Sequence, residues 1–98
     1  MLDQLTQESF AGYVQTRFEL MLEPDQPVSL ELTEVTALPN RARQPRQPFS
    51  LVFRGPHTPA LAQRMYTFVH PQVGTIENLF IVPVGQDEQG RYYQAVFN

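Results

Sequence analysis

The sequence contains no cysteine and no lysine, and each absence removes a class of chemistry. Without cysteine the chain can form neither disulfides nor thiolate metal sites, and it has no thiol nucleophile. Without lysine it can form no Schiff base and no phosphate-binding P-loop. All seven basic residues are therefore arginine, and the formal net charge is −3. This charge argues against general binding to nucleic acid or to anionic membranes.

Side chains suited to catalysis or metal binding are also scarce. The two histidines, His57 and His70, lack the helical spacing or the cysteine partners that mark a zinc site. The three serines, Ser9, Ser29 and Ser50, lie outside any glycine-rich elbow of the hydrolase type. We therefore expect no enzymatic activity, no cofactor and no metal. An enzyme remains an alternative only if one histidine lies in a cleft beside a carboxylate.

Long hydrophobic segments are missing too. The first five residues carry neither the basic nor the apolar region of a signal peptide, and no apolar run is long enough to span a bilayer. The expected location is the cytoplasm, with export only as part of a larger assembly.

The densest apolar run extends from Thr75 to Gly85, and its length, Ile and Val content and flanking glycines predict a central strand. Hairpin loops on either side predict neighbouring strands at 65–70 and 91–97. Asn78 interrupts the alternation and is a candidate β-bulge. Both faces of this three-stranded unit are apolar, which predicts that each face is covered. One face has Tyr66, Phe68, Leu79, Ile81, Tyr93 and Phe97, and the other has Met65, Val69, Ile76, Phe80, Val82, Val84, Tyr92 and Val96.

The whole chain, residues 1–98, predicts a single mainly β domain: a small antiparallel barrel or a strongly coiled sheet of about six strands with one short N-terminal helix. A Pro24–Pro27 turn separates the first two strands. Gly12 falls inside the predicted helix, where we expect it to provide room for close approach to the sheet. The predicted helix covers 6–15, and the predicted strands cover 18–22, 28–37, 49–54, 65–70, 75–84 and 91–97.

Three groups of residues are candidates for a functional role. The proline-rich loop at 39–48 carries Arg41, Arg43 and Arg46 without an acidic residue, and it is either a solvated connector or a site for an acidic protein surface. Glu77 falls on an apolar face, where a structural ion pair with a partner such as Arg54 or Arg64 would offset its burial. The alternative is that Glu77 lies at an exposed strand end. The third group is a set of aromatic residues that could line the mouth of a ligand-binding barrel, namely Tyr66, Phe68, Tyr92 and Tyr93.

Four short motifs carry a family resemblance: F-S-L-V-F-R-G-P from Phe49, H-P-Q-V-G-T from His70, V-P-V-G from Val82 and Y-Q-A-V-F-N from Tyr93. With them the chain resembles an uncharacterised bacterial family of domains of unknown function, about 100 residues long. The resemblance implies no activity and no catalytic residues, because the motifs are strand ends and turns. It implies a loose association with phage-tail-collar-like and tail-derived fibre proteins.

Two functions follow as hypotheses. The first is a non-enzymatic structural or adaptor module that binds a protein partner or itself through strand edges and exposed loops, as an accessory to a phage-tail-like or fibre system. The alternative is a small-ligand-binding β-barrel that uses the aromatic mouth.

Overall fold

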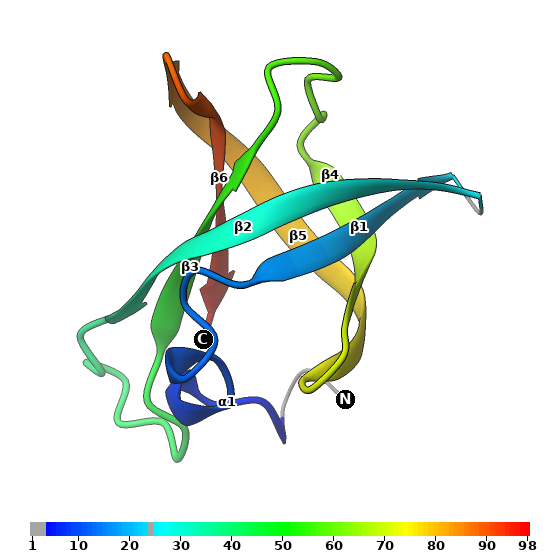
Figure 1. The fold of residues 1–98 in the computed structure, drawn as a ribbon. Helices are drawn as coiled ribbons and strands as arrows, with labels where there is room; N and C mark the ends of the chain where they lie inside the picture. Colours follow the sequence, from blue (N-terminus) through cyan, green and yellow to red (C-terminus); the bar gives the residue numbers. More distant parts are fainter. Residues whose placement is uncertain (1–3, 24) are drawn as a thin grey trace.

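A computed structural model shows a closed barrel of six antiparallel strands in the order β1-β2-β3-β6-β5-β4, with β4 returning to β1 (Figure 1). The structure describes residues 4–23 and 25–98, so Pro24 of the predicted turn lies outside it. The elements are α1 (Gln7–Ala11), β1 (Arg17–Glu23), β2 (Gln26–Ala37), β3 (Phe49–Gly55), β4 (Arg64–His70), β5 (Gly74–Asp87) and β6 (Gly90–Phe97). The mainly β fold predicted from the sequence is confirmed, and the choice between barrel and coiled sheet is settled in favour of the barrel.

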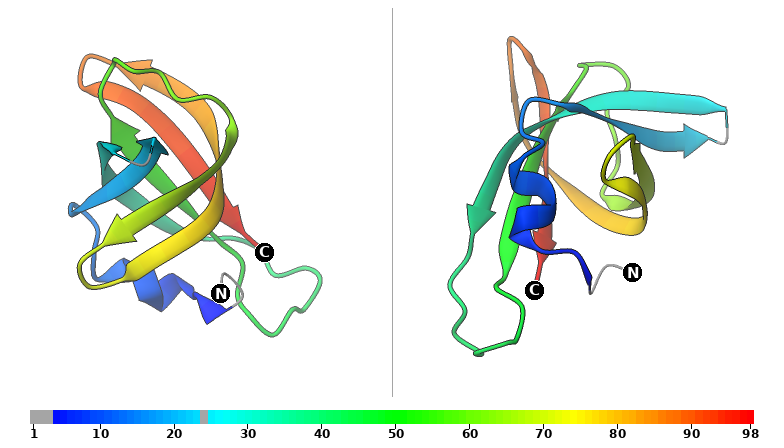
Figure 2. Two further views of the ribbon diagram at one scale, coloured as in Figure 1. Left: turned by 90° about the vertical axis from the view of Figure 1, so that its right-hand side faces the viewer. Right: turned by 60° about the horizontal axis from the view of Figure 1, so that its bottom comes forward.

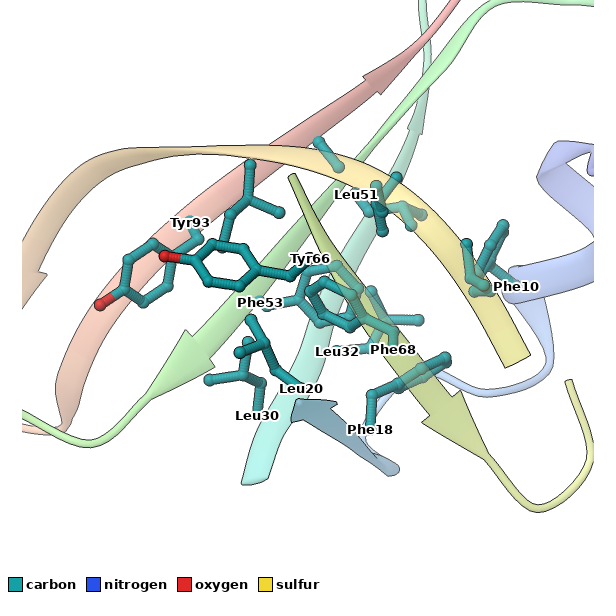
Figure 3. Packing of buried hydrophobic residues seen from close by; sticks show 14 of the residues in the cluster. Phe10, Phe18, Leu20, Leu30, Leu32, Leu51, Phe53, Tyr66, Phe68 and Tyr93 are labelled. Carbon is teal, nitrogen blue, oxygen red and sulfur yellow. The ribbon is translucent and has the colours of Figure 1, made fainter. Parts of the chain in front are cut away.

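The interior of the barrel is filled by one continuous core. Alternate residues of each strand point inward, so β3 contributes Phe49, Leu51 and Phe53, all fully buried. Figure 3 shows the central rings and leucines meeting from several strands in the same space. Phe53 lies in the middle of this core, with its ring centre 5.5 Å from that of Phe18 and 5.0 Å from that of Phe68. A barrel of this size has room for side chains and little else.

The outer face of β4, β5 and β6 is exposed, and the prediction that both faces of this unit are covered is therefore wrong. Met65, Phe80, Val84 and Val96 are 58%, 43%, 52% and 49% exposed, respectively. The physical reason is closure, because a sheet that curls into a barrel buries its inner face against itself and needs no second layer. The face predicted around Tyr66 is the one that became the interior.

The predicted bulge at Asn78 is present and explains one exception to this division of faces. Asn78 has φ of 59°, and the β4–β5 register shifts between the Tyr66–Leu79 pair and the Phe68–Ile76 pair. The extra residue turns Ile76 from the predicted outer face to the inside, where it is 3% exposed.

The two ends of the barrel are closed by different segments. Figure 2 shows α1 lying across one end, close to the C-terminus and to the loop between β2 and β3. Phe10 of α1 packs there on Phe49 and Phe97, with ring centres 5.9 and 5.6 Å away. At the other end, the buried Leu61 belongs to the segment between β3 and β4.

The helix is shorter than the predicted range of 6–15, because it ends at Ala11. Gly12 is its C-cap rather than a mid-helix residue, and a Cβ added there would meet nothing within 4 Å. The expectation that Gly12 provides room for close approach to the sheet is therefore wrong. The one buried residue of α1 is Phe10, so packing of that ring holds this short helix in place.

Candidate functional site

The arginine-rich loop contains one arginine held against the barrel and two exposed ones. Arg46 donates from Nη1 to the carbonyl oxygen of Leu5 at 2.9 Å and from Nη2 to that of Asn98. These bonds fasten the loop to the segment before α1 and to the end of the chain. Arg41 and Arg43 are exposed, so they are the two arginines of this loop that a partner could reach.

Arg54 forms its ion pair with Glu31 of β2 and not with Glu77. The Arg54 Nη2 atom lies 2.8 Å from Glu31 Oε1, and Nη1 donates to Gln89 Oε1 at 3.2 Å. Glu77 is exposed on β5, and β6 separates β5 from β3. The predicted pair of Arg54 and Glu77 is wrong because the bulge at Asn78 turns Glu77 out of the core, where it needs no partner.

The predicted aromatic mouth does not exist. Tyr66, Phe68 and Tyr93 are at most 4% exposed and belong to the core. The hydroxyls of the two tyrosines bond to the backbone at 61–62, which closes that end of the barrel. Tyr92 projects to the outside instead. The ligand-binding alternative thereby loses its cavity, because the rings that were to line the cavity fill it.

The turn between β5 and β6 gathers three polar side chains outside the barrel. The Asp87 carboxylate accepts from the Gln89 backbone N–H and from the Tyr92 hydroxyl, each at 2.8 Å. Both hydrogen bonds hold the pKa of Asp87 below its usual range, and the bond from Gln89 has the larger effect. His57 Nε2 lies 2.6 Å from the carbonyl oxygen of Asp87 and not from its carboxylate. The cluster therefore fastens the segment after β3 to this turn.

His70 is buried and bonded on both ring nitrogens. Its Nδ1 accepts from the backbone N–H groups of Gln72 and Val73 at 3.0 and 3.2 Å, and its Nε2 lies 3.0 Å from Thr16 Oγ1. Because the Thr16 hydroxyl donates its one proton to the Tyr13 carbonyl oxygen, Nε2 carries the ring proton and Nδ1 is the acceptor. This arrangement requires a neutral ring, and desolvation by burial lowers the pKa of His70.

We expect the free energy of unfolding to fall as the pH drops below the ordinary histidine pKa of about 6.5. The unfolded chain binds a proton there, whereas the folded chain keeps His70 neutral because its pKa is lowered. The stabilisation is thus complete above that pH and is lost as the pH falls toward the lowered value. Urea unfolding at pH 7.5 and pH 5 measures the difference.

The control variants are His70→Asn and His57→Asn. Asparagine at position 70 can still accept from the N–H two residues on, but it does not titrate. The pH 7.5 to pH 5 difference should shrink in His70→Asn, and His57→Asn replaces the other, exposed histidine for comparison. Equal differences in wild type and His70→Asn would contradict the assignment of a neutral His70.

The exposed side chains of Met65, Val69, Phe80, Val84 and Val96 form an apolar face over β4, β5 and β6. Met65 and Phe80 lie directly opposite each other in the β4–β5 ladder. Cross-strand neighbours of this kind have Cβ atoms about 5 Å apart, so the two side chains form one continuous surface. The sequence shows that these residues are apolar. Only closure of the barrel determines that their side chains face solvent.

The chemistry that the described residues can support is limited. Among residues 4–23 and 25–98, no group of three or more histidine, aspartate or glutamate side chains could hold a metal ion. Within the same ranges, none of the helical structure has the length and hydropathy needed to cross a bilayer. The two histidines bond to a backbone carbonyl and to Thr16, and neither of these partners is a carboxylate.

A closed six-stranded barrel with a packed interior and an apolar outer face defines the structural class. The chain belongs to a family described as a domain of unknown function, DUF6916, whose model matches residues 5–97. The resemblance indicated by the four motifs is thereby confirmed for the family. Comparison with curated proteins and with solved structures gave no match.

Proposed function

We propose that the protein is a non-enzymatic interaction module that binds through the apolar face over β4, β5 and β6. The observation that supports this proposal is the exposure of five large hydrophobic side chains on neighbouring strands. Contiguous apolar surface on a small domain is costly in water and commonly marks a protein-binding site. Strand edges, the route expected from the sequence, are only partly covered in this unit, because β5 pairs with β4 over 74–81 and with β6 over 82–87.

The partner that this face fits is a second copy of the chain. Glu77 is exposed beyond one end of the Met65–Phe80 pair, whereas the Arg64 guanidinium lies over the Tyr66 ring, 4.9 Å from its centre, and not on this face. A two-fold axis that passes near Phe80 would pack the Met65 and Phe80 side chains of the two copies against each other and bury Phe80 at the centre. Self-complementary surfaces of this kind are the basis of two-fold dimers.

A more specific part of the proposal is the kind of assembly in which this module acts. The resemblance to domains associated with phage-tail-collar-like proteins supports an accessory role in a phage-tail-like or fibre system, where repeated copies of one chain assemble on each other. A module that pairs through one apolar face suits such a role without any catalytic group.

The test is sedimentation equilibrium of the wild-type chain and of Phe80→Asp. We expect the wild type to dimerise and Phe80→Asp to weaken the dimer at least tenfold, since a charge at the centre of an apolar interface would be buried without a partner. The tenfold change in the dissociation constant corresponds to about 1.4 kcal/mol.

The matched control is Thr36→Asp, which adds the same charge at an exposed position of β2 and should leave the dimer unchanged. A wild-type chain that stays monomeric at millimolar concentration would refute self-association through this face. A dimer that survives Phe80→Asp would place the interface elsewhere.

A further inference from the structure

The strand β2 changes its neighbour half-way along. Its first half pairs with β1, from Gln26 to Glu31, and its second half pairs with β3, from Glu31 to Ala37. β3 ends at Gly55, and the chain then turns away through Pro56. Figure 1 shows the first half of β2 continuing beside β1 and away from the segment that follows β3. One edge of β2 before Glu31 is therefore open, although the barrel as a whole is closed.

The open edge offers the backbone groups of Ser29. An antiparallel ladder bonds alternate residues, and Leu32 N–H donates to Thr16 at 3.0 Å on the β1 side. In the same register Leu30 bonds to β1, and the N–H and C=O groups of Ser29 point the opposite way. No described residue bonds the Ser29 backbone on that side. Pro27, two residues earlier, has no N–H, so Ser29 is the donor of this edge.

A hollow of about 490 Å³ lies alongside this edge, on the outside of the barrel. Ser29 and Glu31 form part of its lining from β2, and Arg54 and Pro56 form part from β3 and the segment after it. Its volume falls within the range of about 300–1,000 Å³ that is typical of ligand sites. The hollow thus provides space for a ligand next to the unpaired backbone N–H and C=O groups of Ser29.

The charges around the hollow favour an anionic side chain. Arg17, Glu31 and Arg54 lie in one row across β1, β2 and β3. Glu31 is paired with Arg54, whereas the hydrogen bond of the Arg17 guanidinium is a long one, 3.4 Å, to Ser29 Oγ. Among the described residues, Arg17 has no ion pair with Glu31 or with its neighbour Glu19. The hollow is lined by two arginines, Arg17 and Arg54, and one carboxylate, Glu31, so its lining carries a net positive charge.

We propose that this hollow binds an extended peptide segment of a partner protein, which adds as a short strand to β2 at Ser29 and places an acidic side chain against Arg17. Strand addition uses backbone hydrogen bonds for affinity and side-chain contacts for selectivity. The site lies on β1, β2 and β3 and shares no residue with the apolar face, so it is independent of the proposed dimer.

The first measurement is amide hydrogen exchange of the free chain. Ser29 should exchange quickly, because its N–H has no acceptor, while Leu30 should be protected by its bond to β1. A strongly protected Ser29 amide in the free chain would mean that the edge is already paired, and it would overturn the proposal.

The second measurement is a nuclear magnetic resonance titration with a capped pentapeptide of alternating valine and aspartate. It should shift the Ser29 amide resonance and slow exchange at Ser29. The same peptide with lysine in place of aspartate should bind at least tenfold more weakly, because it meets Arg17 with a like charge. Absence of a shift with the aspartate peptide at about 1 mM, or equal binding of both peptides, would overturn the proposal.

Two variants separate this site from other effects. Arg17→Gln should weaken binding of the aspartate peptide at least tenfold, and Arg41→Gln, at an exposed loop position, should leave it unchanged. Equal effects of the two variants would overturn the role of Arg17. The titration is repeated in Phe80→Asp, where binding should persist whether or not the chain dimerises.

Discussion

Replacing Phe53 by alanine should lower the free energy of unfolding by about 3–5 kcal/mol, a large part of the 5–15 kcal/mol that stabilises a typical domain. The ring is fully buried, and it packs between the rings of Phe18 and Phe68. Its removal leaves a cavity that the surrounding strands cannot fill, because closure of the barrel ties each strand to two neighbours over at least part of its length. Urea unfolding followed by circular dichroism measures the loss.

The matched control is Phe80→Ala, which removes the same ring from the outside of β5. Its side chain is 43% exposed, so we expect a loss of about 1 kcal/mol or less. Both variants are measured at low micromolar protein, where the proposed dimer does not contribute. Equal losses at the two positions would contradict the assignment of inner and outer faces.

Replacing Gly90 by alanine should cost about 3 kcal/mol or more. Gly90 opens β6 with φ of 150°, a conformation that residues with a side chain rarely adopt. A Cβ at this position would lie 2.2 Å from the carbonyl oxygen of Gly55. That atom belongs to the backbone of the neighbouring strand and cannot rotate away, so the β3–β6 ladder has to shift.

The control for Gly90 is Gly85→Ala in the same hairpin. A Cβ at Gly85 meets nothing within 4 Å, and the residue has no positive φ. The free energy of unfolding of Gly85→Ala should differ from that of the wild type by about 0.5 kcal/mol or less. If Gly90→Ala is equally mild, the close approach of β6 to Gly55 is not a constraint on the fold.

The strands themselves are predictable because their pattern is local. The alternation in F-S-L-V-F-R places Phe49, Leu51 and Phe53 on one face without any knowledge of the partner strand, and all three are buried. The bulge at Asn78 is predictable for the same reason, since an asparagine that breaks an apolar alternation favours a positive φ.

The environment of each face is not predictable in this way. Met65 and Phe80 have the same apolar character as the core residues, and only the return of β4 to β1 decides which face becomes the interior. That contact joins Glu19 with Val69, which are 50 positions apart in the chain. No short segment carries a signal for such a pairing, so the sequence pattern predicts a second buried face where the structure has an exposed one.

The polar contacts depend on register and were missed for a related reason. Arg54 meets Glu31 because the register of β2 on β3 shifts between Leu32 and Glu34, which the amino-acid pattern alone does not indicate. The hollow beside Ser29 depends on the same pairing, since it lies where β2 loses β3 as its neighbour. One long strand at 28–37 was predicted, and a strand longer than its neighbours is the signal that could have indicated two partners.

The position of β6 has a consequence for the order in which the structure can form during synthesis. β6 follows the other five strands of the barrel in sequence, and it lies between β3 and β5. Until β6 has emerged from the ribosome, β3 and β5 each expose an unpaired strand edge. The apolar side chains of the barrel interior stay in contact with water during that time. The barrel therefore closes only once β6 has paired with both of these strands, and before that point the open edges can pair with other chains.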